Sequence, residues 1–454
     1  MCVSCGDHLA LTCDYHPSNA SNFTTITFKK CLDAGDKSEH RKLQVAVRLP
    51  HQIAVRGQRV PIFIATHQAD MRCLVLGFLL MSCAYFPQLM VAAGLDHNAE
   101  FLSRIIRISS LLLIIVGCLP INVNRLRISD LVLIFGMATA VLMFILRQPS
   151  ITPNMDDLFW NGPLGLIPLC LLSLRCRAIN YNAIWQSLAI LMTIQLLTGV
   201  SLYSWGISSS DNDGITGFMG NANMFAMLCL LIIARFVACG SPSVIFLPLS
   251  ILGVVLSGSL AGVASLAIIG VLGVFKRRSF LLFLVIVVST IIIGSLAWIL
   301  VEAIALEMPR SIMHLDFKID SALQSLTGNS IIADSRSIQL RHEYVSTMFD
   351  GILSSDVALF GGFRGERYFA ADSQVISYVL SFGIPVTAMI ATPIIAVVMN
   401  LFLNSVRRWP SALPLLVAII FLLVNRMCVY FTGAMLLALV LSELRTLIWL
   451  QKST

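Results

Sequence analysis

The chain has 454 residues, of which 57% are hydrophobic and only 12% are charged. Soluble globular domains carry about 25% charged residues, so this composition excludes a water-soluble globule. The formal net charge is +7, but membrane proteins collect Lys and Arg on their cytoplasmic side, so the charge does not indicate a nucleic-acid partner. We therefore expect an all-α polytopic membrane protein that binds no nucleic acid.

The first 70 residues differ in composition from the rest of the chain. They contain no apolar run longer than a few residues, and the sequence turns abruptly apolar from Met71 onward. The segment after Met1 lacks the charged region, apolar stretch and small-residue cleavage site of a signal peptide. We expect residues 1–70 to be a cytoplasmic extension that is disordered, or an artefact of a start codon upstream of a natural start at Met71.

Four potential zinc ligands lie near the N-terminus, namely Cys2, Cys5, Cys13 and His16. Structural zinc takes four such ligands in a tetrahedron. Only seven residues separate the two pairs, and no hydrophobic run surrounds them. We therefore predict no metal site and no cofactor, with zinc as the alternative.

Apolar runs after Met71 approach the length of about 20 residues that a membrane-spanning helix needs. They predict about twelve membrane helices. The expected ranges are 73–93, 105–121, 130–146, 162–174, 183–203, 218–238, 243–257, 260–275, 280–303, 375–403, 411–428 and 431–449.

The basic residues of the connecting loops indicate the orientation of these helices. On one side lie Arg125 and Arg127, Arg175 and Arg177, Lys276 to Arg278, Arg407 and Arg408, and Arg445 and Lys452. Cytoplasmic loops carry the Lys and Arg excess, so we assign this side to the cytoplasm. The even helix count places both termini there, with helices 1–9 in residues 71–304 and helices 10–12 in residues 375–454.

Residues 305–374 form one long segment on the opposite side. No run in it can span a membrane, and Asp334 or Ser335 is suited to cap a helix that follows. Ile338, Val345 and Phe349 then recur at helical spacing. The segment is thus predicted to be a large extracytoplasmic loop with an amphipathic helix along the membrane surface.

Four arginines stand out in this loop, namely Arg336, Arg341, Arg364 and Arg367. The planar fork of arginine holds a phosphate through two parallel charge-assisted hydrogen bonds. A lipid-linked diphosphate would lie at this depth. The alternative is that these arginines pair with acidic residues of the loop or with lipid phosphates.

Three stretches carry a resemblance to a known family. Residues 217–226 read GFMGNANMFA, residues 256–262 read LSGSLAG, and Arg341 is followed by the Gly turn at 359–362. They resemble the O-antigen ligase and polymerase superfamily, in which an Asn turn opens one membrane helix, a Ser turn opens a later one, and a Gly turn ends an Arg-bearing helix.

The residue at position 372 distinguishes the ligases from the polymerases of this superfamily. Asp372-Ser373 is followed by nine residues, Gly383, two residues and Val386. O-antigen ligases have a His where Asp372 lies, whereas the Wzy-type polymerases often have an acidic residue, so the chain is more similar to the polymerases. The loop 204–217 lacks the arginine that is usual in the superfamily, which suggests that Arg364 or Arg367 supplies the second phosphate-binding arginine instead.

The resemblance implies a cofactor-independent glycosyltransferase with a GT-C-like helical fold in the bacterial inner membrane. Such an enzyme moves the growing glycan from its undecaprenyl diphosphate carrier onto the next lipid-linked oligosaccharide unit in surface-polysaccharide (O-antigen, lipopolysaccharide) biosynthesis. Its partners are this lipid-linked oligosaccharide, the lipid bilayer and a candidate chain-length regulator.

The implied chemistry needs a cation for the leaving group and a proton acceptor, and residues of this chain are candidates for both roles. Arg341 would stabilise charge on the leaving diphosphate, and Asp372 or Glu343 would accept a proton from the incoming hydroxyl. The remaining candidate substrate-binding residues are Arg336, Arg364, Arg367, Asn221 and Asn223.

Other interpretations remain open. Asn221, Asn223 and Asp372 are also favoured helix caps. The enzyme could be a ligase that transfers polysaccharide to lipid A core. A secondary transporter or flippase of lipid-linked sugars is a further alternative, but it usually needs ionisable residues inside membrane helices, and we expect almost none here.

Overall fold

The computed structural model describes residues 11–14, 24–30, 43–47, 60–87, 98–121, 126–147, 163–175, 179–204, 215–274, 359–361, 373–403, 412–424 and 431–452. The chain divides into two compact units, Met1–Thr66 and His67–Thr454. The predicted helix at 280–303 and nearly all of the predicted loop at 305–374 lie outside the described residues.

The first unit contains a small antiparallel sheet. Its strands are β1 (Leu11–Asp14), β2 (Thr24–Lys30) and β3 (Leu43–Val47), in the order β1-β2-β3. Strand β2 is rich in the β-branched and aromatic residues that fit a pleated surface. The sheet lies within residues 1–70, whose role stays a prediction, and Cys2, Cys5 and His16 lie outside the described residues.

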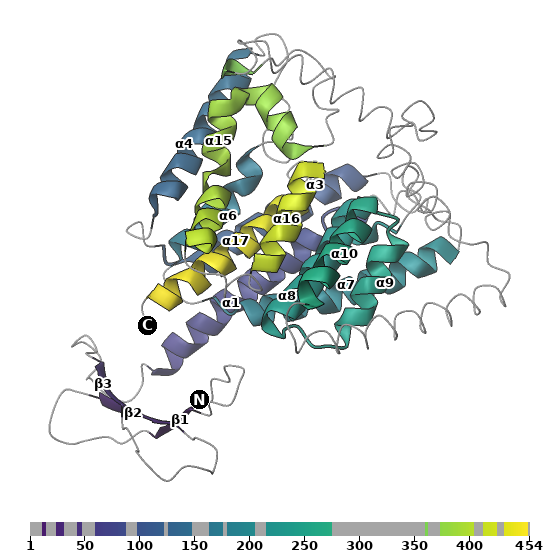
Figure 1. Cartoon of the computed structure of the whole chain (residues 1–454). Helices are drawn as coiled ribbons and strands as arrows, with labels where there is room; N and C mark the ends of the chain where they lie inside the picture. Colours follow the sequence, from purple (N-terminus) through teal and green to yellow (C-terminus); the bar gives the residue numbers. More distant parts are fainter. Residues whose placement is uncertain are drawn as a thin grey trace. The chain divides into compact units, whose positions relative to one another are not determined.

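The second unit is helical in its described part (Figure 1). Its elements are α1 (Val60–Ser82), which begins in the first unit, α3 (Ala99–Cys118), α4 (Ile128–Arg147), η2 (Pro163–Leu166), α6 (Ile167–Leu174), α7 (Tyr181–Ser204), η3 (Gly217–Met219), α8 (Ala222–Cys239), α9 (Phe246–Leu256), α10 (Leu260–Val274), α15 (Gln374–Leu403), α16 (Leu413–Val424) and α17 (Phe431–Lys452). Each predicted membrane range except 280–303 overlaps one of these elements.

Four described helices are long and apolar enough to cross a membrane: Ala99–Cys118, Tyr181–Leu202, Ala222–Cys239 and Gln374–Leu401. Shorter apolar helices cover Ile128–Met143, Phe246–Leu256, Leu260–Gly270 and Leu413–Leu423. The chain is thus mostly helical with the character of a membrane protein, and the number of twelve spans stays a prediction.

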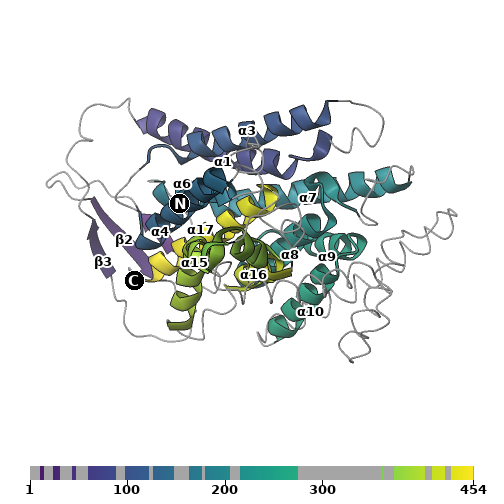
Figure 2. The ribbon, with the colours of Figure 1, turned by 90° about the horizontal axis from the view of Figure 1, so that it is seen from above.

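Helices α1 and α3 form a close pair, side by side in Figure 2. An added Cβ on Gly77 would lie 2.8 Å from Ile114 Cγ1, and the Ser110 hydroxyl donates a 2.8 Å hydrogen bond to the Gly77 carbonyl. Small residues and hydroxyls at such a contact let two helix backbones approach where lipid supplies no hydrophobic driving force. The turn after α1 is held in the same way, because the Ser103 hydroxyl donates to the Ala84 carbonyl.

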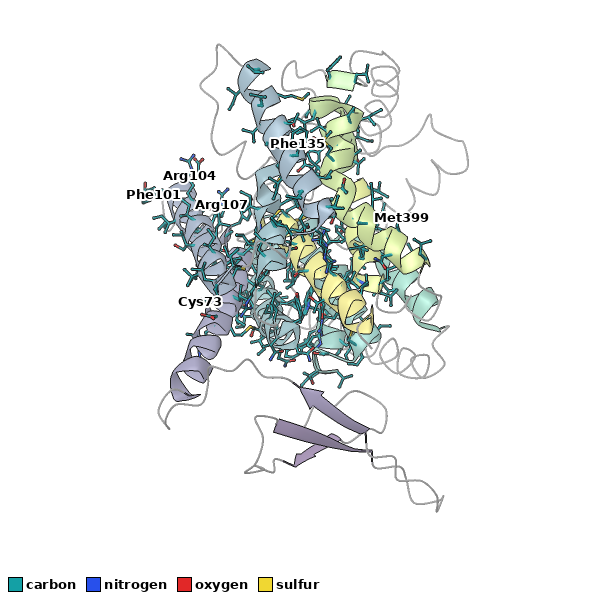
Figure 3. All side chains as sticks on the ribbon, turned by 90° about the vertical axis from the view of Figure 1, so that its left-hand side faces the viewer. Cys73, Phe101, Arg104, Arg107, Phe135 and Met399 are labelled. Carbon is teal, nitrogen blue, oxygen red and sulfur yellow. The ribbon has the colours of Figure 1, made fainter. Side chains whose placement is uncertain are left out.

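Helix α8 lies in the core, whereas α3 and α4 have outward apolar faces. Every residue from Met224 to Arg235 is buried, as expected for a helix that is hydrophobic all round. In contrast, Phe101 and Phe135 are 65% and 63% exposed. Met399 of α15 is 52% exposed, and Figure 3 shows Phe101 and Met399 toward opposite edges of the helices.

Candidate functional site

The structure describes two of the candidate site residues, Asn221 and Asn223. The other candidates lie outside the described residues: Arg336, Arg341, Glu343, Arg364, Arg367 and Asp372. The described part of the candidate site consists of the turns that carry the two asparagines and the elements around them.

The two asparagines have different roles in the turn that opens α8. Asn221 is the N-cap, and its Oδ1 accepts a 2.7 Å hydrogen bond from the backbone N–H of Asn223. The capping alternative is thus observed for Asn221. The side chain of Asn223 instead reaches across to α10, where its Oδ1 accepts a 2.6 Å hydrogen bond from the Ser259 hydroxyl.

The serine turn before α10 is ordered by its own hydroxyls. Ser257 Oγ donates to the Val254 carbonyl at 2.6 Å and accepts from the Ser259 N–H at 3.3 Å. Ser259 Oγ accepts from the Gly262 N–H at 3.1 Å, which caps α10 while the same hydroxyl donates to Asn223. The asparagine turn and the serine turn therefore form one hydrogen-bonded unit, although 36 residues separate the bonded side chains.

Gln195 of α7 fixes the start of the asparagine turn. Its Oε1 accepts from the Phe218 N–H at 3.3 Å, and its Nε2 donates to the Ser82 carbonyl at 3.1 Å. Gly217 has a φ of 57°, and a Cβ there would lie 2.6 Å from Gln195 Oε1. Only glycine fits this combination of positive φ and close approach. The amide of Gln195 thus links the end of α1 to the turn that opens α8.

A second pair of motif glycines meets at a kink in α15. Gly383 lies inside that helix with a φ of 80° and a ψ of 167°. A Cβ on Gly383 would lie 2.4 Å from the Leu359 carbonyl oxygen, and a Cβ on Gly361 would lie 2.6 Å from the Ser381 carbonyl carbon. The Gly turn that follows the predicted Arg-bearing helix is therefore packed against the α15 backbone.

Arg107, which is not among the residues predicted from the sequence, is linked to the asparagine turn through Tyr85. Its side chain donates from Nε to the Ser103 carbonyl at 3.3 Å and from Nη2 to the Ser103 hydroxyl at 3.1 Å. The guanidinium carbon lies 5.3 Å from the centre of the Tyr85 ring. A Cβ on Gly220 would lie 2.7 Å from Tyr85 Cγ, so Tyr85 contacts both Arg107 and the turn. An arginine inside a predicted membrane helix was the available signal.

At the other end of α8, a buried ion pair joins this helix to α17. Arg235 Nη2 lies 2.6 Å from Glu443 Oε1 and donates a 2.7 Å hydrogen bond to Asn182 Oδ1. The Trp185 indole N–H donates to Glu443 Oε2 at 2.8 Å. Asn223 and Arg235 are twelve residues apart on α8, or roughly 18 Å at the helical rise.

A second ion pair joins α17 to the start of α4. Arg445 Nη1 lies 2.5 Å from Asp130 Oδ1 and donates to Ser173 Oγ at 2.8 Å, while Nη2 donates to Ser129 Oγ at 3.2 Å. Burial, together with the nearby Arg445, lowers the pKa of Arg127, which precedes the helix. These contacts bring together the ends of helices whose basic loops were predicted to share one side.

The two ion pairs correct the expectation that helix interiors contain almost no ionisable residues. Arg235, Glu443, Asp130 and Arg445 are all less than 9% exposed, although each lies on an apolar helix. Buried charges are tolerated when they are paired and hydrogen-bonded. All four residues lie within the predicted ranges 130–146, 218–238 and 431–449, so the sequence already contained these charges. Their pairing could not be predicted, because the partners are 208 residues apart in one pair and 315 in the other.

Among the residues that the structure describes, no three His, Cys, Asp or Glu side chains gather as metal ligands. No model of a known protein family matches the chain, and no curated protein matches it.

Proposed function

We propose that this protein is a glycosyltransferase that polymerises undecaprenyl-diphosphate-linked oligosaccharide units at the periplasmic face of the bacterial inner membrane. The observation that carries the proposal is the 2.6 Å hydrogen bond between Asn223 and Ser259. The family resemblance links their two turns only through sequence, and nothing in the local sequence of either turn requires that the two meet. Their joining at one end of the bundle supports a shared site.

The contact between Gly361 and α15 supports the same proposal. Gly361 lies against Ser381, and Ser373 stands just before the first turn of α15, roughly 12 Å from Ser381 at 1.5 Å per residue. Gly361, from the Gly turn of the family resemblance, and Ser373, which follows Asp372 in the sequence, thus both lie at this one helix.

The proposed reaction is a displacement at the anomeric carbon of the donor sugar. The acceptor hydroxyl oxygen bonds to this carbon, the bond to the diphosphate oxygen breaks, and the diphosphate leaves with the electron pair. Asp372 or Glu343 takes the hydroxyl proton, and Arg341 stabilises the developing negative charge. The guanidinium suits this role because it stays protonated at any working pH.

Asn223 and Ser259 are proposed to contact sugar hydroxyls. Amide and hydroxyl groups both donate and accept hydrogen bonds, so they match the mixed donors and acceptors of a glycan. Asn221 is assigned to capping, because its Oδ1 is engaged with the α8 backbone.

Silver-stained lipopolysaccharide from a deletion strain tests the proposal. Loss of a polymerase leaves core plus a single repeat unit, and the wild-type gene should restore the ladder of long chains. Bare core in the deletion strain would identify a ligase instead, and an unchanged ladder would contradict both enzymes.

A transporter or flippase of lipid-linked sugars is the second candidate, and the buried ion pairs favour it. Ion-coupled transport uses ionisable residues inside membrane helices, and Glu443 and Asp130 supply two such carboxylates. Because each carboxylate is held by an arginine at 2.6 Å or less, we favour a structural role. Proton-driven uptake of lipid-linked sugar by vesicles containing the purified protein would reverse this preference.

A further inference from the structure

We infer that the outer face of α4 binds an anionic phospholipid, with the lipid phosphate at Arg127 and an acyl chain along the exposed apolar side chains of the helix. The ligand class is a glycerophospholipid whose headgroup carries a net negative charge, as in phosphatidylglycerol. This inference does not depend on the proposed function, because it concerns the lipid that surrounds the protein and not the reaction.

Helix α4 has two different faces. Its inner face packs against α15 (Figure 1), where a Cβ on Gly136 would lie 2.8 Å from Met389 Cβ. The outer face carries large apolar side chains that are exposed to the surroundings, namely Ile128, Leu131, Phe135 and Leu142. Their spacings of three, four and seven residues place them on one side of an α-helix. The outer face is therefore a continuous apolar stripe.

The stripe is long enough to accommodate an acyl chain. Ile128 and Leu142 are fourteen residues apart on α4, or roughly 21 Å at the helical rise. The hydrocarbon part of one leaflet is about 15 Å thick, which is half of the bilayer core. Ile128 is 81% exposed and directly follows Arg127. A lipid on the stripe would thus have its acyl chain on apolar side chains and its headgroup beside an arginine.

Arg127 is fixed at the polar end of this stripe. Its carbonyl accepts hydrogen bonds from the N–H of Asp130 at 2.9 Å and from the N–H of Leu131 at 3.1 Å, which ties its backbone to the first turn of α4. Its side chain is exposed. Basic side chains at the ends of apolar helices lie at the level of the lipid headgroups, so Arg127 is at the depth of a lipid phosphate.

The charges around Arg127 favour an anion. Asp130 is the carboxylate beside it, but Oδ1 of Asp130 forms the ion pair with Arg445, and Oδ2 accepts the backbone N–H of Arg127 at 3.2 Å. One carboxylate therefore serves two guanidinium groups, which leaves one positive charge in excess. A guanidinium binds a phosphate through charge-assisted hydrogen bonds, and a lipid phosphate at Arg127 would balance this excess.

The pKa of Arg127 agrees with this imbalance. Burial lowers the pKa first, the positive charge of Arg445 lowers it further, and Asp130 and Tyr181 act in the opposite direction. Of the two charged neighbours, Arg445 has the larger effect. The potential at the Arg127 guanidinium is thus more positive than the single carboxylate compensates.

Native mass spectrometry of lipid binding tests the inference. The purified full-length protein in a neutral detergent is titrated with dioleoyl phosphatidylglycerol, and dioleoyl phosphatidylcholine and inorganic phosphate are titrated in parallel arms. Arg127→Ala should weaken phosphatidylglycerol binding by about fivefold, as expected for one basic side chain at a lipid surface, and should leave phosphatidylcholine binding unchanged. Higher concentrations of ammonium acetate should weaken phosphatidylglycerol binding more in the wild type than in Arg127→Ala.

Arg104→Ala is the matched control. Arg104 is also an arginine on an apolar helix, but its exposed guanidinium is paired with Glu100 at 2.7 Å, so phosphatidylglycerol should bind to this variant as to the wild type. Phe135→Ser interrupts the apolar stripe and should weaken the binding of both phospholipids, because their acyl chains are the same.

Each contrary outcome overturns a definite part of the inference. Wild-type affinity for phosphatidylglycerol in folded Arg127→Ala, or an equal loss in Arg104→Ala, would overturn the role of Arg127. Inorganic phosphate that binds as tightly as phosphatidylglycerol would identify a free-anion site and overturn the assignment to a lipid. If Arg127→Ala does not fold, Arg127→Gln and Phe135→Ser decide, and wild-type affinity in both would overturn the inference.

Discussion

The two ends of α8 are held by different chemistry. At its start, Asn223 and Ser259 form a neutral hydrogen bond between two turns. Near its end, Arg235 and Glu443 form a buried ion pair with α17. A broken buried ion pair leaves an uncompensated charge, whereas a broken neutral pair costs much less. Mutations should therefore affect stability at the charged end and activity at the neutral end.

The largest loss of stability is expected for Glu443→Ala. It leaves the Arg235 guanidinium buried without its carboxylate, which typically costs about 3–5 kcal/mol. In detergent, the unfolding temperature of this variant should be strongly lowered, or the variant should fail to fold. Glu100→Ala is the control, because its pair with Arg104 is exposed and such pairs contribute at most about 1 kcal/mol. Equal stability of the two variants would contradict the structural role of the ion pair.

The next largest loss of stability is expected for a substitution at the kink in α15. Gly383→Ala places a Cβ 2.4 Å from the Leu359 carbonyl oxygen at a φ of 80°, so both strain and a backbone clash oppose it. Gly240→Ala is a matched control, since its φ is 70° but nothing lies within 4 Å of an added Cβ. We expect Gly240→Ala to lower the free energy of unfolding by about 1 kcal/mol, and Gly383→Ala to lower it by clearly more. Similar unfolding temperatures for the two would contradict the packing of the 359–361 turn on α15.

The hydrogen bond between the turns should contribute about 1 kcal/mol of coupling to stability. A double-mutant cycle of Asn223→Ala and Ser259→Ala measures this coupling in the free energy of unfolding. Both single variants should nevertheless lose polymer, because the same side chains are proposed to contact the glycan. Asn221→Ala removes only a cap, at a cost of about 1 kcal/mol, and should keep activity. Full polymer in Asn223→Ala would remove this residue from the site.

The smallest effect on stability is expected for Asp372→Asn. Asn and Asp cap helices about equally well, so the unfolding temperature should hardly change. If Asp372 accepts the proton of the incoming hydroxyl, polymer should nevertheless disappear at normal protein levels. Wild-type chain length in this variant would restrict Asp372 to capping.

Sequence patterns predicted elements that depend on local composition. The apolar run lengths located the described helices because a bilayer fixes how long a spanning helix must be. Helix α1 begins at Val60 rather than near residue 73, because His67, Gln68 and Asp70 lower the hydropathy of residues that are still helical. Asn221 was a foreseeable cap, since capping is a local property of the chain.

Contacts between distant segments could not be predicted in the same way. The ion pairs of Glu443 and Asp130 join residues more than 200 positions apart. The spacing of apolar residues along the sequence predicts helices but not which charged residues pair. The stacking of Arg107 on Tyr85 also depends on how α3 packs beside the turn after α1. The resemblance led to the two turns, but only the three-dimensional packing shows that Asn223 meets Ser259.

The most direct test of the central claim is polymerisation in vitro. Purified full-length protein in nanodiscs is incubated with undecaprenyl-diphosphate-linked repeat units from its own strain, and the products are resolved by gel and mass spectrometry. We predict lipid-linked glycans of two or more repeats, with one undecaprenyl diphosphate released for each bond formed, and loss of both products in Asn223→Ala. Repeat units that stay single in the presence of folded wild-type protein, or that are transferred only when lipid A core is added, would contradict the account.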